Sequence, residues 1–263
     1  MKQRHTKMSN VFEYINSLPE NTQRIRLERF RTYYLPSLER FKNLKILHCS
    51  GNEIEFLPKL PDTLIELICP NNKLIGLPQL PDTLKFLDCS NNELTKLPQL
   101  PNTLKSLDCS YNLLTDLPKL PNTLKSLSCH INKLTILPQL PNKFKSLICY
   151  KNQLTEIPNL PDTLKFLICN YNKITTLPEL PITLKDFCCL DNNLPFEDIE
   201  SWRTFNKFKS TFYKLKYGHC LERYYIKNIR NKCINKEVID LVYSPDYNFY
   251  KRLLDPTIIK MFC

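Results

Sequence analysis

The chain has 263 residues, of which 42% are hydrophobic, a formal net charge of +11 and a mean hydropathy of −0.33. This composition is sufficient for a folded, soluble chain, and no run of about 18 apolar residues predicts a membrane-spanning helix. The first ten residues are polar and basic with no apolar segment behind them, so we expect no secretory signal.

Residues 1–43 are predicted to form an N-terminal cap. They contain an irregular copy of the repeat that follows, in which Ile25 and Leu27 take the places of two buried residues while Phe30 replaces an expected asparagine. We expect a short helix near Val11 to Leu18. Atypical end repeats are typical of solenoid proteins, because the outermost repeat must cover an exposed edge.

Residues 44–194 repeat a unit of 20 residues eight times. The unit reads Leu-Lys-x-Leu-x-Cys-x-x-Asn-x-Leu-Thr-x-Leu-Pro-x-Leu-Pro-Asn/Asp-Thr. A unit this short cannot bury its own apolar face, so the fixed period predicts a solenoid in which every repeat packs on its neighbours. The copies begin at Leu44, Leu64, Leu84, Leu104, Leu124, Phe144, Leu164 and Leu184.

Within one copy, Leu87 and Cys89 alternate with Phe86 and Asp88, which predicts a short strand that buries the first pair and exposes the second. The Leu-Pro-x-Leu-Pro segment should be extended and polyproline-like, because proline fixes its own φ and disfavours a helical conformation in the residue before it. One asparagine per copy can both donate and accept hydrogen bonds, so we expect it to pair with turn backbone. These asparagines are Asn52, Asn72, Asn92, Asn112, Asn132, Asn152, Asn172 and Asn192.

The unit matches the leucine-rich repeat, with cysteine in the third leucine position, and its L-P-x-L-P ending resembles the repeats of bacterial effector proteins. The composition, with no alanine and abundant Lys, Asn, Ile, Tyr and Phe, resembles leucine-rich repeat proteins encoded by large DNA viruses of amoebae. The resemblance implies an α/β solenoid with a parallel β-sheet on the concave side and an extended convex side. It also implies a viral or effector protein that acts on host proteins.

Eight of the 12 cysteines recur every 20 residues on the buried side of the predicted strands. We interpret them as small buried hydrophobes, because their spacing suits neither disulfides nor zinc ligands. A row of free thiols indicates a reducing compartment, the cytoplasm or nucleus of a host cell. Cys189-Leu190-Asp191 spells the Cys-x-Asp motif of effector ubiquitin ligases with similar repeats, but Cys189 occupies the same position as the other seven. We therefore expect it to be structural.

A column of lysines directly follows the first leucine of the repeats and is interrupted only at Ile65. It is either an anion-binding row for nucleic acid or an acidic partner, or a solvated edge that opposes end-to-end aggregation, and we favour the second interpretation. The column consists of Lys45, Lys85, Lys105, Lys125, Lys145, Lys165 and Lys185.

Residues 195–263 are predicted to form a helical C-terminal cap or tail. Ile199, Trp202 and Phe205 recur at helical spacing after three acidic residues, so a first helix should cover the last repeat. The remainder is basic and rich in tyrosine. It could stack on nucleic acid, but we favour a small helical core surrounded by solvated charge.

The outward strand positions vary from copy to copy while the rest of the unit is nearly constant. In the later copies they hold aromatic and β-branched residues, which predicts a protein-binding surface on the concave face. The candidate residues are Phe86, Tyr111, His130, Ile131, Ile148, Tyr150, Phe166, Ile168 and Tyr171.

No catalytic or metal-binding constellation is apparent. We therefore predict a non-enzymatic protein-interaction module without cofactor, membrane partner or small-molecule substrate. The alternatives are a substrate receptor linked to ubiquitin ligation and a basic nucleic-acid-binding protein.

Overall fold

The computed structural model describes residues 11–194, 199 and 202–203. The chain divides after Ile199 into two compact units. In the second unit, Trp202 and Arg203 are helical and the Trp202 side chain is buried; Ile199, in the first unit, is helical as well. The rest of the predicted C-terminal helical region lies outside the described residues. No helix among the described residues is long and apolar enough to cross a membrane.

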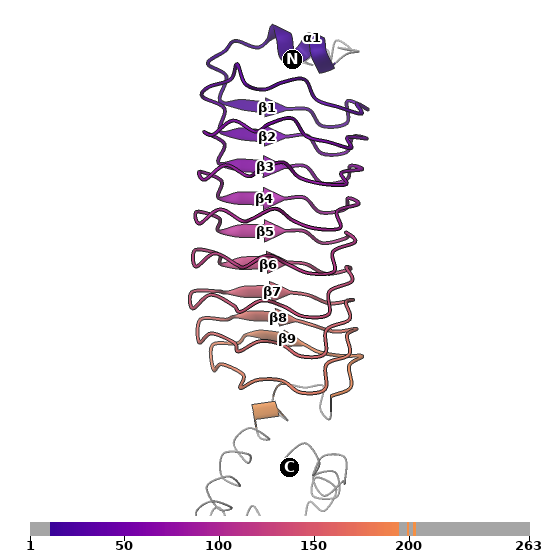
Figure 1. Ribbon diagram of the computed structural model, residues 1–263. Coiled ribbons are helices and arrows are strands. Elements are labelled where there is room, and N and C mark those ends of the chain that lie inside the picture. Colours follow the sequence, from indigo (N-terminus) through magenta and orange to yellow (C-terminus); the bar gives the residue numbers. More distant parts are fainter. Residues whose placement is uncertain (1–10, 195–198, 200–201, 204–263) are drawn as a thin grey trace, which may run out of the picture. The chain divides into compact units, whose positions relative to one another are not determined.

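The N-terminal end of the stack is covered by α1, which spans Val11–Ser17 (Figure 1). The helix buries Val11 and Ile15, which are four residues apart and therefore lie on one side of it. The Arg40 guanidinium donates to the carbonyls of Ile15 and, at 3.0 Å, of Leu18. These bonds satisfy groups that the end of a helix leaves without partners. The predicted helix is confirmed, while the boundaries of the predicted cap stay a prediction.

Nine strands of three residues each form a single parallel sheet in which every strand lies beside the next one along the chain (Figure 1). Eight come from the regular repeats, and β1 comes from the irregular first copy. Neighbouring strands are paired 20 residues apart, as in Leu87 with Leu107, so the register follows the repeat. The strands are β1 (Arg24–Arg26), β2 (Ile46–His48), β3 (Glu66–Ile68), β4 (Phe86–Asp88), β5 (Ser106–Asp108), β6 (Ser126–Ser128), β7 (Ser146–Ile148), β8 (Phe166–Ile168) and β9 (Asp186–Cys188).

The core is built from columns of equivalent residues. The middle residue of a strand points inward and the cysteine that follows the strand is fully buried, as predicted for Leu87 and Cys89. The return segments between the strands contain no helix in the described part of the chain and bury leucines such as Leu97 and Leu100, as predicted. The buried cysteines form no disulfide, and they are Cys49, Cys69, Cys89, Cys109, Cys129, Cys149, Cys169 and Cys189.

The repeated asparagine joins each coil to the one before it. Asn112 donates from Nδ2 to the carbonyls of Cys109 and Ser110 in its own coil, at 3.2 and 3.1 Å, and to that of Cys89 in the preceding coil, at 3.0 Å. Its Oδ1 accepts from the Leu94 amide at 3.0 Å. The predicted asparagine ladder is therefore confirmed, and it needs an amide because one side chain both donates and accepts.

A second ladder is formed by the threonine that ends most of the repeats. Thr123 Oγ1 lies 2.7 Å from the carbonyl oxygens of both Asn102 and Leu104 in the preceding coil. Thr83, Thr103, Thr163 and Thr183 bond in the same way. These bonds hold the edge at which the return segment leads into the next strand.

Candidate partner-binding face

The outward side chains of the strands and of the turns after them form what we call the sheet face, on the concave side of the solenoid. Of the predicted binding residues on strands, Phe86 and Phe166 are 41% and 39% exposed. Ile148 and Ile168 are half-buried and lie side by side, because they are paired in register between β7 and β8. Apolar groups therefore face solvent on these strands.

Three rings lie against one another just after β5, β6 and β7, and we call them the ring cluster. The rings of Tyr111 and His130 meet edge to face with centroids 5.1 Å apart, and those of His130 and Tyr150 stack with centroids 4.4 Å apart. Ser128 Oγ lies 2.9 Å from His130 Nδ1 and fixes the orientation of the imidazole. Such aromatic pairs stabilise beyond their buried area, so the cluster is a preformed surface.

The ring cluster is uncharged at neutral pH. Partial burial lowers the pKa of His130, and the carboxylate of Asp108 opposes this shift only in part. The pKa of Tyr150 is raised, first by burial and then by the charge and the hydrogen bond of Tyr111. The cluster therefore offers flat apolar surface edged by hydroxyl groups, which is the character of residues that anchor protein interfaces.

The residue before each ladder asparagine has a left-handed backbone. In the early coils this position holds Gly51, Asn71 and Asn91, with φ of 67°, 57° and 51°. In the later coils φ is similar, but the position holds the larger side chains Tyr111, Ile131, Lys151 and Tyr171. Glycine and asparagine tolerate this conformation, whereas other residues, and β-branched ones above all, are strained in it. The later coils are therefore less stable than they would be with glycine or asparagine at this position, but they carry larger side chains there.

Replacing Lys151 with asparagine is expected to stabilise the protein by about 1 kcal/mol, because the strain of a left-handed lysine is relieved. Urea unfolding of both proteins measures the difference. Lys173→Asn is the matched control, because Lys173 is also exposed but is not among the residues with positive φ. The strain account is contradicted if the two substitutions change stability equally.

The sheet face is acidic over β3 to β5. A hollow of about 340 Å³ is lined there by residues that include Phe86, Glu66, Asp88 and Asp108. Asp88 and Asp108 are register partners on adjacent strands. Each accepts hydrogen bonds from the serine two residues later, and neither forms an ion pair with a described residue. Two unpaired carboxylates side by side repel each other and favour a cationic partner.

The structure gathers most of the predicted binding residues on one part of the sheet face. Tyr111, His130 and Tyr150 form the ring cluster, and Ile131 follows His130 directly. Ile148, Phe166 and Ile168 lie on β7 and β8, and Tyr171 follows β8 with the Lys151 ammonium 5.7 Å from its ring centroid. Phe86 lies apart, in the acidic hollow.

Two residues were not among the predicted binding residues although they shape this surface. Ser128 orients His130, and Asp108 acts on the charge of both His130 and Tyr150. The strand alternation showed that both point outward. It could not show their partners, because these contacts depend on side-chain rotamers.

Cys189 is fully buried in the column of cysteines, as expected for a structural residue. Catalytic thiols require access to substrate, which this position does not give. Within residues 11–194, 199 and 202–203, no three side chains of His, Cys, Asp or Glu come together in a way that could hold a metal ion.

A scan against protein-family models and a search of curated proteins gave no match. Among solved structures, YopM from Yersinia enterocolitica WA-314 is similar with a TM-score of 0.66 and 35% identity, over 68% of this chain and 39% of that chain. YopM from Yersinia pestis, described as a leucine-rich effector protein, gives 0.61 and 30%, over 68% of this chain and 58% of that chain. A Shigella effector leucine-rich repeat domain gives 0.54 and 29%, over 77% and 81%.

The chain is therefore a leucine-rich repeat protein with an α/β solenoid fold. Its repeats resemble those of the bacterial effectors YopM and the Shigella protein. The chain spans less than two thirds of the length of either YopM chain and about four fifths of the Shigella domain.

Proposed function

We propose that this protein is a non-enzymatic interaction module that binds another protein through the sheet face. The observation that carries the proposal is the ring cluster, in which three preordered aromatic side chains stand beside the outward isoleucines of β7 and β8. The left-handed backbone at Tyr111, Ile131 and Tyr171 supports it, because strained residues that the fold does not need are found at functional sites.

The charges of the sheet face support a partner of complementary charge. The acidic hollow with Asp88 and Asp108 lies on the strands next to the ring cluster. A complementary surface would place a lysine or arginine on the carboxylates and an apolar side chain on the rings. Asp88 and Asp108 lie on β4 and β5, and the rings follow β5, β6 and β7. Adjacent strands are about 4.8 Å apart, so these two groups would be separated by roughly 5–10 Å.

The two alternative functions find less support on the sheet face. Ubiquitin transfer at Cys189 would need an exposed thiol, and this thiol is buried. Nucleic acid would bring phosphates close to Asp88 and Asp108, which would repel them. The basic C-terminal region invoked for nucleic-acid binding lies outside the described residues.

We further propose that the protein acts on host proteins in a reducing compartment, the cytoplasm or nucleus. The free cysteines support the choice of compartment, since thiols persist where disulfides do not form. The effector names of the similar structures support the choice of target. The resemblance in composition to viral proteins stays a prediction.

The proposal is tested by affinity capture from candidate host cells with the wild type and a Tyr150→Ala/Tyr171→Ala variant. Captured proteins are then purified and their affinities measured. Because truncation of a central aromatic anchor costs about 2 kcal/mol or more, the variant should bind a true partner at least about 30-fold more weakly.

The matched control is Tyr33→Ala/Ile136→Ala, which removes two side chains that are 57% and 60% exposed and lie off the strands of the sheet face. This control should bind the partner as the wild type does. Equal binding by all three proteins would show that the ring cluster is not the binding surface. Turnover of a captured protein would show that the module is an enzyme.

A further inference from the structure

The threonine ladder is interrupted at one coil. Lys143 occupies the position that threonine holds in the other regular repeats, so the carbonyls of Asn122 and Leu124 lack the bonds that Thr123 and Thr163 give to the coils before them. The departure is local, since the next residue, Phe144, is buried like the leucines it replaces. Nothing in the fold explains why this repeat has a lysine in place of the threonine whose hydroxyl group bonds the preceding coil.

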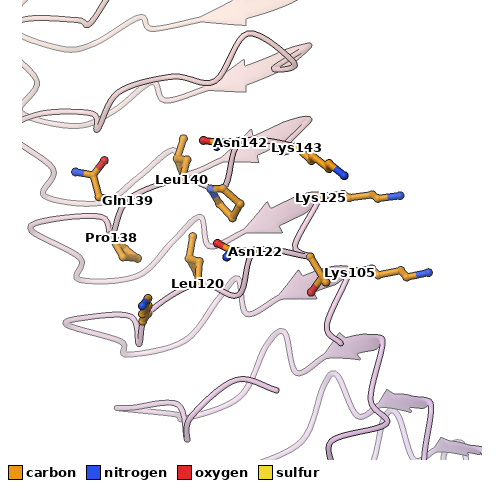
Figure 2. Close-up of a pocket in the computed structure, with 12 residues that line it drawn as sticks. Lys105, Leu120, Asn122, Lys125, Pro138, Gln139, Leu140, Asn142 and Lys143 are labelled. Atoms are coloured by element: carbon orange, nitrogen blue, oxygen red, sulfur yellow. The ribbon is translucent and has the colours of Figure 1, made fainter. Parts of the chain in front are cut away.

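A groove of about 920 Å³ opens at this interruption, and twelve residues line it (Figure 2). Its apolar lining includes Leu120, Leu140 and Pro138. Lys105, Lys119, Lys125 and Lys143 line it as well, and no lining residue is acidic. Figure 2 shows the side chains of Lys105, Lys125 and Lys143 extending on the same side of the stack. None of the four lysines forms an ion pair with any residue that the structure describes.

The neighbouring turns also lack negative charge. In the repeats away from the groove, the residue before the threonine is Asp62, Asp82 or Asp162, and in the repeat that ends with Thr183 it is Ile182. In the three successive repeats at the groove it is asparagine, at residues 102, 122 and 142, and two of these amides line the groove. The lysine column continues through this region, so its positive charge is unopposed here. Like charges on coils about 4.8 Å apart repel one another unless an anion screens them.

We propose that this groove binds an extended acidic segment of a partner protein. Carboxylates would pair with the lysines, the amides of Asn122 and Asn142 would hydrogen-bond the backbone of the segment, and Leu120 and Leu140 would contact its apolar side chains. An acidic protein segment fits better than nucleic acid, because no aromatic side chain lines the groove to stack on a base. The groove lies where β6 and β7 begin, whereas the ring cluster follows their ends, so this inference does not rest on the proposed function.

The test measures fluorescence anisotropy of the full chain with a labelled peptide of about ten glutamates, which can span about 35 Å when extended. The salt concentration is low, about 50 mM, so that screening is weak. Lys125→Gln/Lys143→Thr should weaken binding about tenfold, and Asn122→Asp/Asn142→Asp by a similar factor. Lys143→Thr restores the usual ladder residue and both aspartates occur in sister repeats, so these proteins should fold.

Lys45→Gln/Lys165→Gln is the matched control, because it removes two lysines of the same column that do not line the groove. It should change the affinity by less than about twofold. Equal losses in the control and groove variants would assign the binding to net charge and overturn the proposal, as would failure of wild type to bind the peptide. Tighter binding of an oligothymidine with the same number of charges would make the groove a nucleic-acid site instead.

Discussion

Replacing Asn112 with aspartate is expected to destabilise the protein by about 3–5 kcal/mol at pH 7, which is a large part of the stability of a typical domain. The side chain is buried, and its Nδ2 donates to the carbonyls of Cys89, Cys109 and Ser110. A carboxylate cannot donate, so the substitution removes three hydrogen bonds and places a negative charge against three carbonyl oxygens. Chemical denaturation followed by circular dichroism measures the loss.

The same variant should recover stability in acid. Burial and the surrounding carbonyls would raise the pKa of the new carboxyl above its unfolded value of about 3.9, so folding favours its protonated form. The loss of stability caused by the aspartate therefore shrinks as the pH falls below the raised pKa of its carboxyl group in the folded state. Asn102→Asp is the control, because Asn102 is exposed and a sister repeat carries Asp82 there. Similar stability losses in both variants would refute the role assigned to the ladder amide.

The second large effect is expected in alkali. Burial raises the pKa of Cys49 to about 12 from an ordinary value of 9.0, and it also raises the pKa of the next six cysteines of the column, through Cys169. Above pH 9 the unfolded chain loses these protons while the folded chain keeps them. The titration of these thiols therefore does not destabilise the folded protein below pH 9, and above pH 9 the free energy of unfolding falls as the pH rises.

The size of the alkaline effect follows from the number of thiols. At pH 10 the titration of each of the seven thiols lowers the free energy of unfolding by about 1.4 kcal/mol. The seven together lower it by about 10 kcal/mol, which matches the total stability of many domains. We expect cooperative unfolding near pH 10 in the presence of a reductant, seen as loss of the circular dichroism signal. A protein of this size without buried thiols would not lose stability for this reason.

Cys109→Ala/Cys129→Ala separates this effect from the titration of tyrosines and lysines. Both cysteines are fully buried, so the variant should be less stable at pH 7 because it leaves cavities in the core. Its stability should nevertheless fall less steeply above pH 9, by about 3 kcal/mol per pH unit. If both proteins lose stability at the same rate, the thiols are not the cause.

The sequence alone predicted the fold well, because each column of equivalent core residues recurs in eight copies of the repeat. The alternation of Leu87 and Cys89 with Phe86 and Asp88, the ladder role of Asn112 and the extended Leu-Pro-x-Leu-Pro segments were all confirmed. Even the irregular copy was assigned correctly, since Ile25 lies opposite Leu47 in the sheet. Packing in a solenoid is local, so the repeat period fixes both the neighbours and the register.

The arrangement of the outward residues was harder to predict. Sequence placed Tyr111, His130 and Tyr150 on the same face, but the stacking of His130 on Tyr150 depends on rotamers and on Ser128. The left-handed backbone at Ile131 was not expected either, because isoleucine disfavours it and only Gly51, Asn71 and Asn91 in sister repeats give a signal. The binding role of these residues stays a prediction.

The asparagine bonds between coils have a consequence for engineering. Because Asn72, Asn92 and Asn112 join their coils in the same way, a block of 20 residues can be cut out without leaving mismatched partners. Removing residues 64–83 should bring Asn92 onto the coil that Asn72 now closes. The length of the solenoid can then be changed in steps of one coil, about 4.8 Å each, while the ring cluster is kept intact.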